Sequence, residues 1–296
     1  MTAGPERLSI NRASIRQWSV RELVEACAAR SVGGVGLWRD DVEGVKAAAV
    51  GAQVRDAGLV VTSLCRGGFV TDPDPAERVR RHDDNRRALD EAAALGTDVL
   101  VFVAGGMAGS GTDLAGARAR VVEAVAELVP DALARGVRVA VEPLHPMFCS
   151  DRCVISTLDQ ALDLADPFPV EAVGVVVDAY HVWWDPGVTA AIDRAGARIA
   201  AFQVCDWVTP LPEGVLTGRG LMGDGAIALP ALRETVEAAG YTGPIEVEIF
   251  NDRWRGRPGD ELLDLMVRRY RTHVLDETPD GPTQRSEAAW TARTTT

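Results

Sequence analysis

The sequence predicts a closed parallel barrel of the (β/α)8 type, a TIM barrel of the α/β class, formed by a single domain. Eight short runs rich in Val, Ile, Leu and Ala alternate with longer stretches in which apolar residues recur three and four positions apart. The short runs are almost continuously apolar, as is typical of strands buried on both faces. A chain of 296 residues with 47% hydrophobic residues suits the one large core of such a barrel.

The predicted strands are 8–11, 34–38, 60–65, 98–103, 137–143, 173–178, 199–204 and 244–249. The stretches between them are rich in alanine and charged residues and predict helices. Several end at a glycine just before the next strand, which is the expected stop signal, namely at Gly58, Gly96, Gly136 and Gly240. An open doubly wound sheet is the alternative fold, but no glycine-rich nucleotide-binding loop follows the first strand. We expect the barrel over residues 1–275 and a polar tail over 276–296.

Composition narrows the classes of partner. The net charge of -12 disfavours nucleic acid, because phosphates are repelled over most of the surface. The sequence shows no signal peptide and no run near the roughly 18 apolar residues of a membrane span, so we expect a cytoplasmic protein without a membrane partner. Five cysteines without a repeated short spacing argue against a disulfide framework. A homo-oligomer remains open.

Four side chains with metal-ligand chemistry stand at the ends of four successive apolar runs: Glu142, Asp178, Gln203 and Glu248. In a barrel the ends of all strands meet at one face. Buried carboxylates are costly unless compensated, and a cation is a common partner. The oxygen-rich set predicts one divalent metal ion, with Mn²⁺ favoured and Mg²⁺, Co²⁺ or Zn²⁺ open. For any single acid, a helix cap or a salt bridge is the alternative.

Several sequence strings carry a resemblance. VEPLHP, VDAYHVWWDP, QVCDW, RGLMGDG and GYTGPIEVEIF resemble the sugar phosphate isomerase/epimerase family, the xylose-isomerase-like barrels that include the ketose 3-epimerases. The likeness runs from the first strand to about residue 275. It implies that Glu142, Asp178, Gln203 and Glu248 hold one divalent ion, and that Glu142 and Glu248 act as base and acid through an enediolate. The family usually carries histidine where this chain has Gln203, and an amide is the weaker ligand.

The resemblance also implies substrate contacts. His181 and Arg219 match positions that contact substrate oxygens beside the metal in the epimerases. His145 and Trp183 lie close to the predicted ligands and are further candidates for binding a small sugar-like molecule. Arg66 ends the third predicted strand, where the mouth of the barrel begins, but only its position suggests a role. No cluster of basic residues beside a glycine-rich turn marks a phosphate pocket, so a non-phosphorylated substrate is expected.

Three functions remain open from the sequence. The favoured one is a metal-dependent isomerase or epimerase of a keto sugar, a cyclitol or a keto-sugar derivative. A lyase or dehydratase that expels a β-substituent from a 3-keto sugar or glycoside begins with the same proton abstraction. A non-catalytic binding or partner subunit is the third, in which the change at Gln203 has removed the metal. The apurinic endonuclease relatives are disfavoured, because their zinc cluster is rich in histidine and this chain has four histidines.

Overall fold

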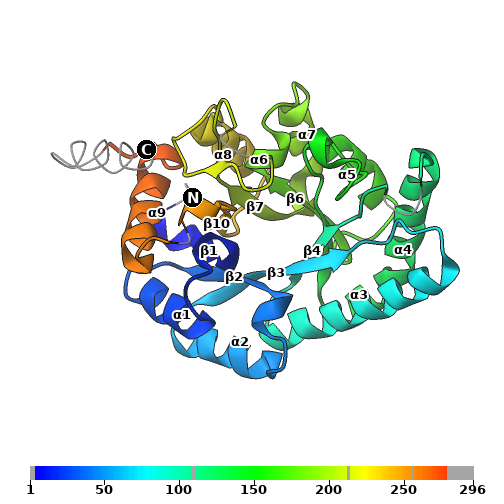
Figure 1. Cartoon of the computed structure of the whole chain (residues 1–296), viewed down its shortest axis with the longest axis horizontal. Helices are drawn as coiled ribbons and strands as arrows, with labels where there is room; N and C mark the ends of the chain where they lie inside the picture. The colour runs from blue at the N-terminus through cyan, green and yellow to red at the C-terminus, as the bar shows by residue number, and fades with distance from the viewer. Residues whose placement is uncertain (1–3, 108–110, 212–213, 255, 279–296) are drawn as a thin grey trace.

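The predicted barrel is confirmed. The computed structural model describes residues 4–107, 111–211, 214–254 and 256–278. Eight parallel strands close into a ring in the order β1-β2-β3-β4-β5-β6-β7-β10, with β10 pairing back to β1 (Figure 1). Their bounds are β1 Leu8–Asn11, β2 Gly34–Trp38, β3 Val60–Gly68, β4 Val99–Val103, β5 Arg138–Val141, β6 Val173–Asp178, β7 Ile199–Val204 and β10 Ile245–Val247.

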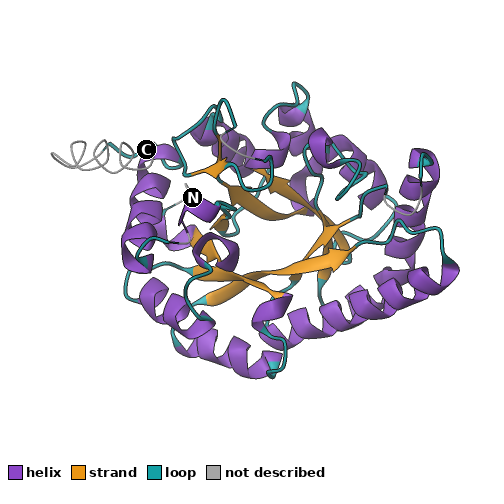
Figure 2. Cartoon of the chain, in the orientation of Figure 1, coloured by secondary structure: helices purple, strands orange, loops and turns teal. Residues whose placement is uncertain are grey.

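Helices surround the ring of strands (Figure 2). They are α1 Val20–Ala28, α2 Ala47–Asp56, α3 Pro75–Leu95, α4 Leu114–Arg135, α5 Leu158–Ala165, α6 Ala179–Val182, α7 Val188–Ala195, α8 Leu229–Ala238 and α9 Gly259–His273. Side-chain caps start several of them, as at Ser19, whose hydroxyl and the Glu22 carboxylate form a capping box. The two longest helices end at Gly96 and Gly136, both with positive φ, as the sequence predicted.

Two short strands were not predicted. β8 (Asp206–Trp207) and β9 (Arg219–Gly220) pair antiparallel outside the barrel. Strands of two residues are too short to show an alternation of apolar and polar residues, so sequence periodicity does not reveal them. Elsewhere the differences lie at element ends, as in β3, which continues to Gly68. The tail predicted over 276–296 falls mostly outside the described residues.

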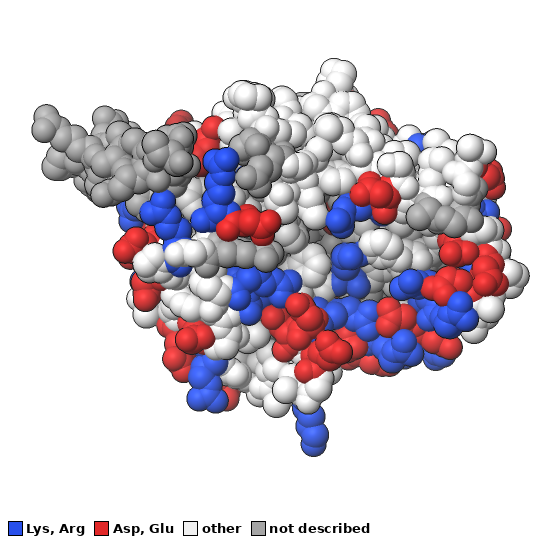
Figure 3. Space-filling view, in the orientation of Figure 1, with Lys and Arg blue, Asp and Glu red and all other residues white. Residues whose placement is uncertain are grey.

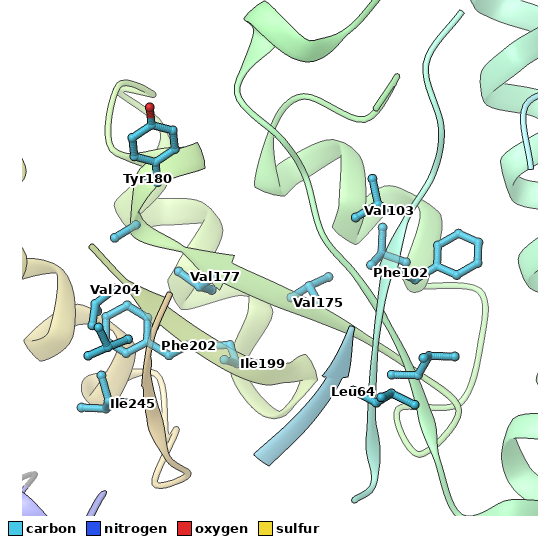
Figure 4. Close-up of a cluster of buried hydrophobic side chains, with 14 of the residues drawn as sticks. Leu64, Phe102, Val103, Val175, Val177, Tyr180, Ile199, Phe202, Val204 and Ile245 are labelled. Carbon is cyan, nitrogen blue, oxygen red and sulfur yellow. The ribbon is translucent and has the colours of Figure 1, made fainter. Parts of the chain in front are cut away.

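The alternation of side chains along each strand separates two cores. Val175 and Val177 of β6 and Phe202 of β7 face outward, where they pack beneath the helices (Figure 4). Val176 belongs to a second, smaller cluster of short side chains on the other face of the strands, inside the barrel. Because successive residues point to opposite faces, Asp178 shares the inward face with Val176. The same period turns the other predicted ligands into the barrel.

The surface carries mixed charge. On the face shown in Figure 3, basic and acidic side chains interleave over α3. Ion pairs such as Arg39 with Asp84 and Glu91 account for part of this pattern. Among the described helices, none is long and apolar enough to cross a membrane.

Candidate active site

A buried carboxylate, Glu246, lies deep in the barrel. It belongs to β10 and is 2% exposed. Its oxygens accept hydrogen bonds from four neutral side chains: Asn11 Nδ2 (2.7 Å), Thr62 Oγ1 (2.6 Å), Ser63 Oγ (2.9 Å) and Gln203 Nε2 (2.9 Å). Charge-assisted hydrogen bonds of this kind compensate an ionised group for the water it has lost. Glu246 is therefore a satisfied structural carboxylate.

Gln203 connects this deep layer to the mouth of the barrel. It pairs in register with Asp178 of β6 on one side and with Glu246 of β10 on the other. An ionised carboxylate only accepts hydrogen bonds, so the amide nitrogen must face Glu246 and the amide oxygen must point elsewhere. That oxygen is buried and has no hydrogen-bond partner within the described ranges. Gln203 thus presents a buried oxygen that is available to accept a ligand contact.

Three more carboxylates form an upper layer at the carboxyl ends of their strands. Glu142 follows β5, Asp178 ends β6 and Glu248 follows β10, and none is more than 5% exposed. Asp178 Oδ1 accepts the backbone N–H of Tyr180 and caps α6, which leaves Oδ2 for the interior. The helix-cap alternative weighed for single acids therefore applies to one oxygen of Asp178.

Arg219 holds two of these carboxylates together. Its Nη1 donates to Asp178 Oδ2 (3.0 Å) and to Glu248 Oε2 (3.1 Å). The guanidinium also lies over the rings of Tyr180 (4.6 Å) and Phe250 (4.9 Å). Arg219 is 2% exposed, so its charge acts in a medium with little water to screen it.

The loop that carries Arg219 is organised by Asp206. This buried carboxylate accepts four backbone N–H groups, from Trp207, Gly223, Gly225 and Ile227, at 2.9–3.0 Å. Gly225 is required there, because a Cβ at this position would lie 2.2 Å from the carbonyl oxygen of Trp207. The RGLMGDG string is thus the sequence of a loop wrapped around Asp206, which fixes where Arg219 enters the site.

His181 is held as a hydrogen-bond donor. Its Nδ1 accepts the backbone N–H of His145 at 3.1 Å, so the neutral ring carries its proton on Nε2. Arg219 Nη2 also lies 3.0 Å from Nε2, but a neutral imidazole cannot accept at both nitrogens. We assign the proton to Nε2, because the backbone donor is fixed, whereas the guanidinium is anchored to two carboxylates through Nη1 and does not depend on an acceptor at Nη2. His145 therefore acts on the site through His181.

Burial and crowding shift the protonation of these groups. Burial raises the pKa of Glu248 to about 8 against the opposing charge of Arg219. Burial, together with Glu248 and Asp178, holds the pKa of Glu142 well above its usual range. Burial also raises the pKa of Asp178, and it lowers the pKa of His181 well below its usual value, with Arg219 adding to the effect. The site contains more buried negative charge than Arg219 alone stabilises.

These residues fit a divalent cation. Ligand atoms of Glu142, Asp178 and His181 lie within 4.8 Å of one another. A protonated Nε2 cannot coordinate, so His181 is the weakest of these three ligand candidates. The unpartnered oxygen of Gln203 and the carboxylate of Glu248 are chemically better suited to coordinate a cation, and with them the ligand set consists of oxygen atoms.

A cavity of about 150 Å³ opens above this layer. Glu142, His181, Arg219 and Glu248 line it with apolar walls that include Trp38 and Phe250. A cavity of about this volume admits a molecule of roughly benzene size.

Not every predicted contact reaches this cavity. His145 stacks on Trp207 at 4.7 Å, Trp183 packs against the same ring at 5.5 Å, and neither is among the described residues that line the cavity. Conversely, the lining includes Arg66, for which only its position suggested a role, and Arg152, which no sequence pattern singled out.

Comparison with known proteins agrees with this architecture. Residues 22–272 match the model of the xylose isomerase-like TIM barrel family. The chain belongs to that family. Curated relatives include a 3-dehydroshikimate dehydratase from Pseudomonas aeruginosa, 29% identical over 69% of this chain, and an inosose isomerase from Halalkalibacterium halodurans, 26% identical over 48%. The chain spans 32% of the length of the first relative and 50% of the second.

Solved structures of the family share the fold. A protein named SMc04130 from Sinorhizobium meliloti 1021 is 47% identical, with a TM-score of 0.87 over 91% of this chain and 99% of that one. The IOLI protein, solved with a zinc atom, is 18% identical with a TM-score of 0.78 over 92% of this chain and 99% of that one. A D-psicose 3-epimerase solved in the presence of D-fructose is 15% identical with a TM-score of 0.72, over 90% and 99%. The last two similarities concern the fold alone.

Proposed function

We propose that this protein is a metal-dependent isomerase or epimerase of a keto sugar, a cyclitol or a keto-sugar derivative. The observation that carries the proposal is the pair Glu142 and Glu248. Both carboxyls are buried, both line one small cavity, and both have a raised pKa. Carboxyls whose pKa approaches the working pH are suited to take up and return a proton.

Each residue of the site has a distinct role in this reaction. One carboxylate of the pair removes the proton from the carbon beside the substrate carbonyl, and the other delivers a proton to the same or the neighbouring carbon. His181 donates its Nε2–H to a substrate oxygen, and Arg219 keeps Asp178 and Glu248 in place. The apolar walls of the cavity exclude water, which strengthens each of these interactions.

One divalent cation completes the proposed site, with Mn²⁺ favoured and Mg²⁺, Co²⁺ or Zn²⁺ open. Glu142, Asp178, Gln203 and Glu248 would hold it. When bound, it supplies the positive charge that polarises the carbonyl and stabilises the enediolate. The support in this chain is the close approach of Glu142 to Asp178 and the amide oxygen of Gln203, which has no partner among the described residues.

A dehydratase is the second candidate. The relatives named 3-dehydroshikimate dehydratase favour it, since one is similar over 69% of this chain. Elimination begins with the same removal of a proton beside a carbonyl, and the enediolate then expels a β-substituent instead of being reprotonated. The residues that would start either reaction are the same.

Incubation in D₂O with a panel of keto sugars and keto-cyclitols tests both candidates. An isomerase or epimerase places deuterium at the carbon beside the carbonyl and accumulates an isomer of unchanged mass apart from the label. A dehydratase releases the β-substituent and forms a conjugated carbonyl that absorbs in the ultraviolet. Absence of both exchange and elimination across the panel, with Mn²⁺ bound, would overturn the proposal.

A further inference from the structure

Two arginines from distant parts of the sequence face the active-site cavity. Arg66 lies near the end of β3, and Arg152 lies in the loop that follows β5. Both line the cavity that contains Glu142 and Glu248. Their separation in sequence explains why no basic cluster marks this place in the sequence itself.

These arginines are poorly neutralised by protein groups. Across the described ranges, no carboxylate lies within ion-pair distance of the Arg66 guanidinium, which stacks instead on the ring of Phe69 at 4.1 Å. Arg152 has a loose pair, 3.7 Å from Asp151, whose side chain is 62% exposed. Arg219, by contrast, binds two buried carboxylates at 3.0 and 3.1 Å.

The two positive charges also act on each other. Burial lowers the pKa of Arg66, and the neighbouring charge of Arg152 lowers it further. The negative charge of Glu142 raises the pKa of Arg66, so Arg66 lies close enough to interact electrostatically with the upper-layer carboxylates. Two guanidinium groups that line one cavity, neither of them held by a close ion pair among the described residues, are a favourable environment for a ligand anion.

The charge balance of the site supports the same conclusion. Glu142, Asp178 and Glu248 carry three negative charges when ionised, and Arg66, Arg152 and Arg219 carry three positive charges. The carboxylate of Glu246, just below this layer, adds a fourth negative charge, so a divalent cation held by the upper carboxylates leaves the site with a net charge of about +1. Neither a neutral sugar nor an uncharged cyclitol would offset that charge.

We propose that Arg66 and Arg152 form an anion subsite that binds a carboxylate or phosphate group of the substrate, which makes the substrate an anionic keto compound. The inference rests on the proposed function for the reactive end of that molecule. The subsite places the charged group on the side of the cavity formed by β3 and the loop after β5. The carbonyl then lies toward Glu142 and Glu248. The small volume of the cavity favours a single ring.

Binding of a matched pair of probes tests the subsite without turnover. We would titrate 3-oxocyclohexane-1-carboxylate and its neutral carboxamide into chelator-treated and Mn²⁺-loaded protein, by calorimetry or ligand-observed NMR. Hydrogen bonds to charged groups predict that the wild type prefers the carboxylate roughly 10- to 100-fold. The preference should persist without metal, because the arginines carry it. Equal binding of carboxylate and carboxamide would overturn the subsite.

Substitutions of the two arginines test whether they cause the preference for the carboxylate over the carboxamide. In Arg66→Gln/Arg152→Gln it should fall below about threefold, whereas Arg66→Lys, which keeps the charge, should retain part of it. Arg194→Gln is the matched control, because Arg194 is paired with three exposed aspartates on the surface and should leave the preference unchanged. If the double variant does not fold, the single variants Arg66→Gln and Arg152→Gln carry the test. An unchanged preference in folded variants would overturn the assignment.

Two further measurements are needed. One distinguishes a phosphate from a carboxylate on the substrate, and the other distinguishes failure of the subsite from failure of the proposed function. Competition by inorganic phosphate tighter than by acetate assigns a phosphorylated substrate, and the reverse order assigns a carboxylate. Deuterium exchange into the keto sugars and keto-cyclitols of the panel in D₂O reports on the proposed function. A carboxylate preference without any exchange would leave the subsite standing and count against the catalytic proposal, and exchange without a preference would do the opposite.

Discussion

Glu246 of β10 and Glu248, which follows that strand, lie two residues apart, point into the same barrel and are similarly buried, yet their surroundings differ. Glu246 accepts hydrogen bonds from four neutral side chains. Glu248 shares one guanidinium group with Asp178, and burial raises its pKa to about 8. Burial alone therefore does not identify a functional carboxylate. The supply of donors around it does, because an under-satisfied acid is the one that can exchange a proton or bind a cation.

The deep carboxylate also supports the upper layer. Asn11, which donates to Glu246, accepts the indole N–H of Trp38 at 2.8 Å and so fixes one wall of the cavity. Gly36 leaves room for this arrangement, since a Cβ there would lie 2.5 Å from Glu246 Oε2. The lower layer positions residues, and the upper layer holds the groups proposed to react.

Removing either proposed proton carrier of the upper layer should impair catalysis most. Glu142→Gln and Glu248→Gln should each lower the rate of deuterium exchange by about 10²- to 10⁴-fold at saturating Mn²⁺, because each removes a proton carrier. Exchange followed by NMR, with metal content measured in parallel, checks this. Glu234→Gln, at an exposed carboxylate, is the control. Full activity of either variant with metal bound would remove that residue from the mechanism.

A substitution in the deep layer should lower the stability of the fold. Glu246→Gln replaces an acceptor by an amide, whose oxygen can keep the bonds from Asn11 Nδ2 and Gln203 Nε2. Its NH₂ then faces the hydroxyls of Thr62 and Ser63, which would have to change from donors to acceptors. We expect a loss of about 1–3 kcal/mol in the free energy of unfolding of the metal-free protein. Glu248→Gln should lose less, since it replaces an under-satisfied acid. Urea denaturation of both variants measures the difference, and the reverse order would contradict the distinction between the layers.

The raised pKa of Glu248 predicts a pH dependence of metal affinity. The proton and the cation compete for the carboxylate, and below a pKa of about 8 the proton is bound. Apparent Mn²⁺ affinity should therefore rise with pH, by about tenfold between one pH unit below that pKa and one above it, and then level off. Calorimetric titrations across this range test the sign. Glu248→Gln should flatten the rise, leaving the part due to Glu142, whose pKa is raised in the same direction.

Much of the fold was accessible from the sequence because its signal is periodic. Near-continuous apolar runs such as 173–178 and 199–204 coincide with β6 and β7. The inward direction of Asp178, Gln203 and Glu248 follows from the period of two along each strand. The features that could not be predicted from the sequence depend on contacts between distant segments. The β8–β9 pair, the hydrogen bonds of Glu246 and the approach of Arg66 to Arg152 leave no local pattern.

The smallest expected effect concerns Gln203, which belongs to both layers. Its nitrogen donates to Glu246 and its unpartnered oxygen is proposed to hold the cation. In Gln203→His, one ring N–H can keep the bond to Glu246 while the other nitrogen coordinates, and imidazole is the better ligand for Mn²⁺, Co²⁺ or Zn²⁺. We expect about fivefold tighter Mn²⁺ binding, equivalent to about 1 kcal/mol.

Calorimetry of Mn²⁺ with chelator-treated protein measures this change, and Gln203→Met, which removes both the ligand oxygen and the donor, should bind more weakly than wild type. If the histidine variant binds no tighter and the methionine variant binds equally well, Gln203 serves Glu246 alone. The cation would then depend on the three upper carboxylates. In that case no residue would belong to both layers: the deep layer would only support the fold, and the upper layer alone would hold the cation and react.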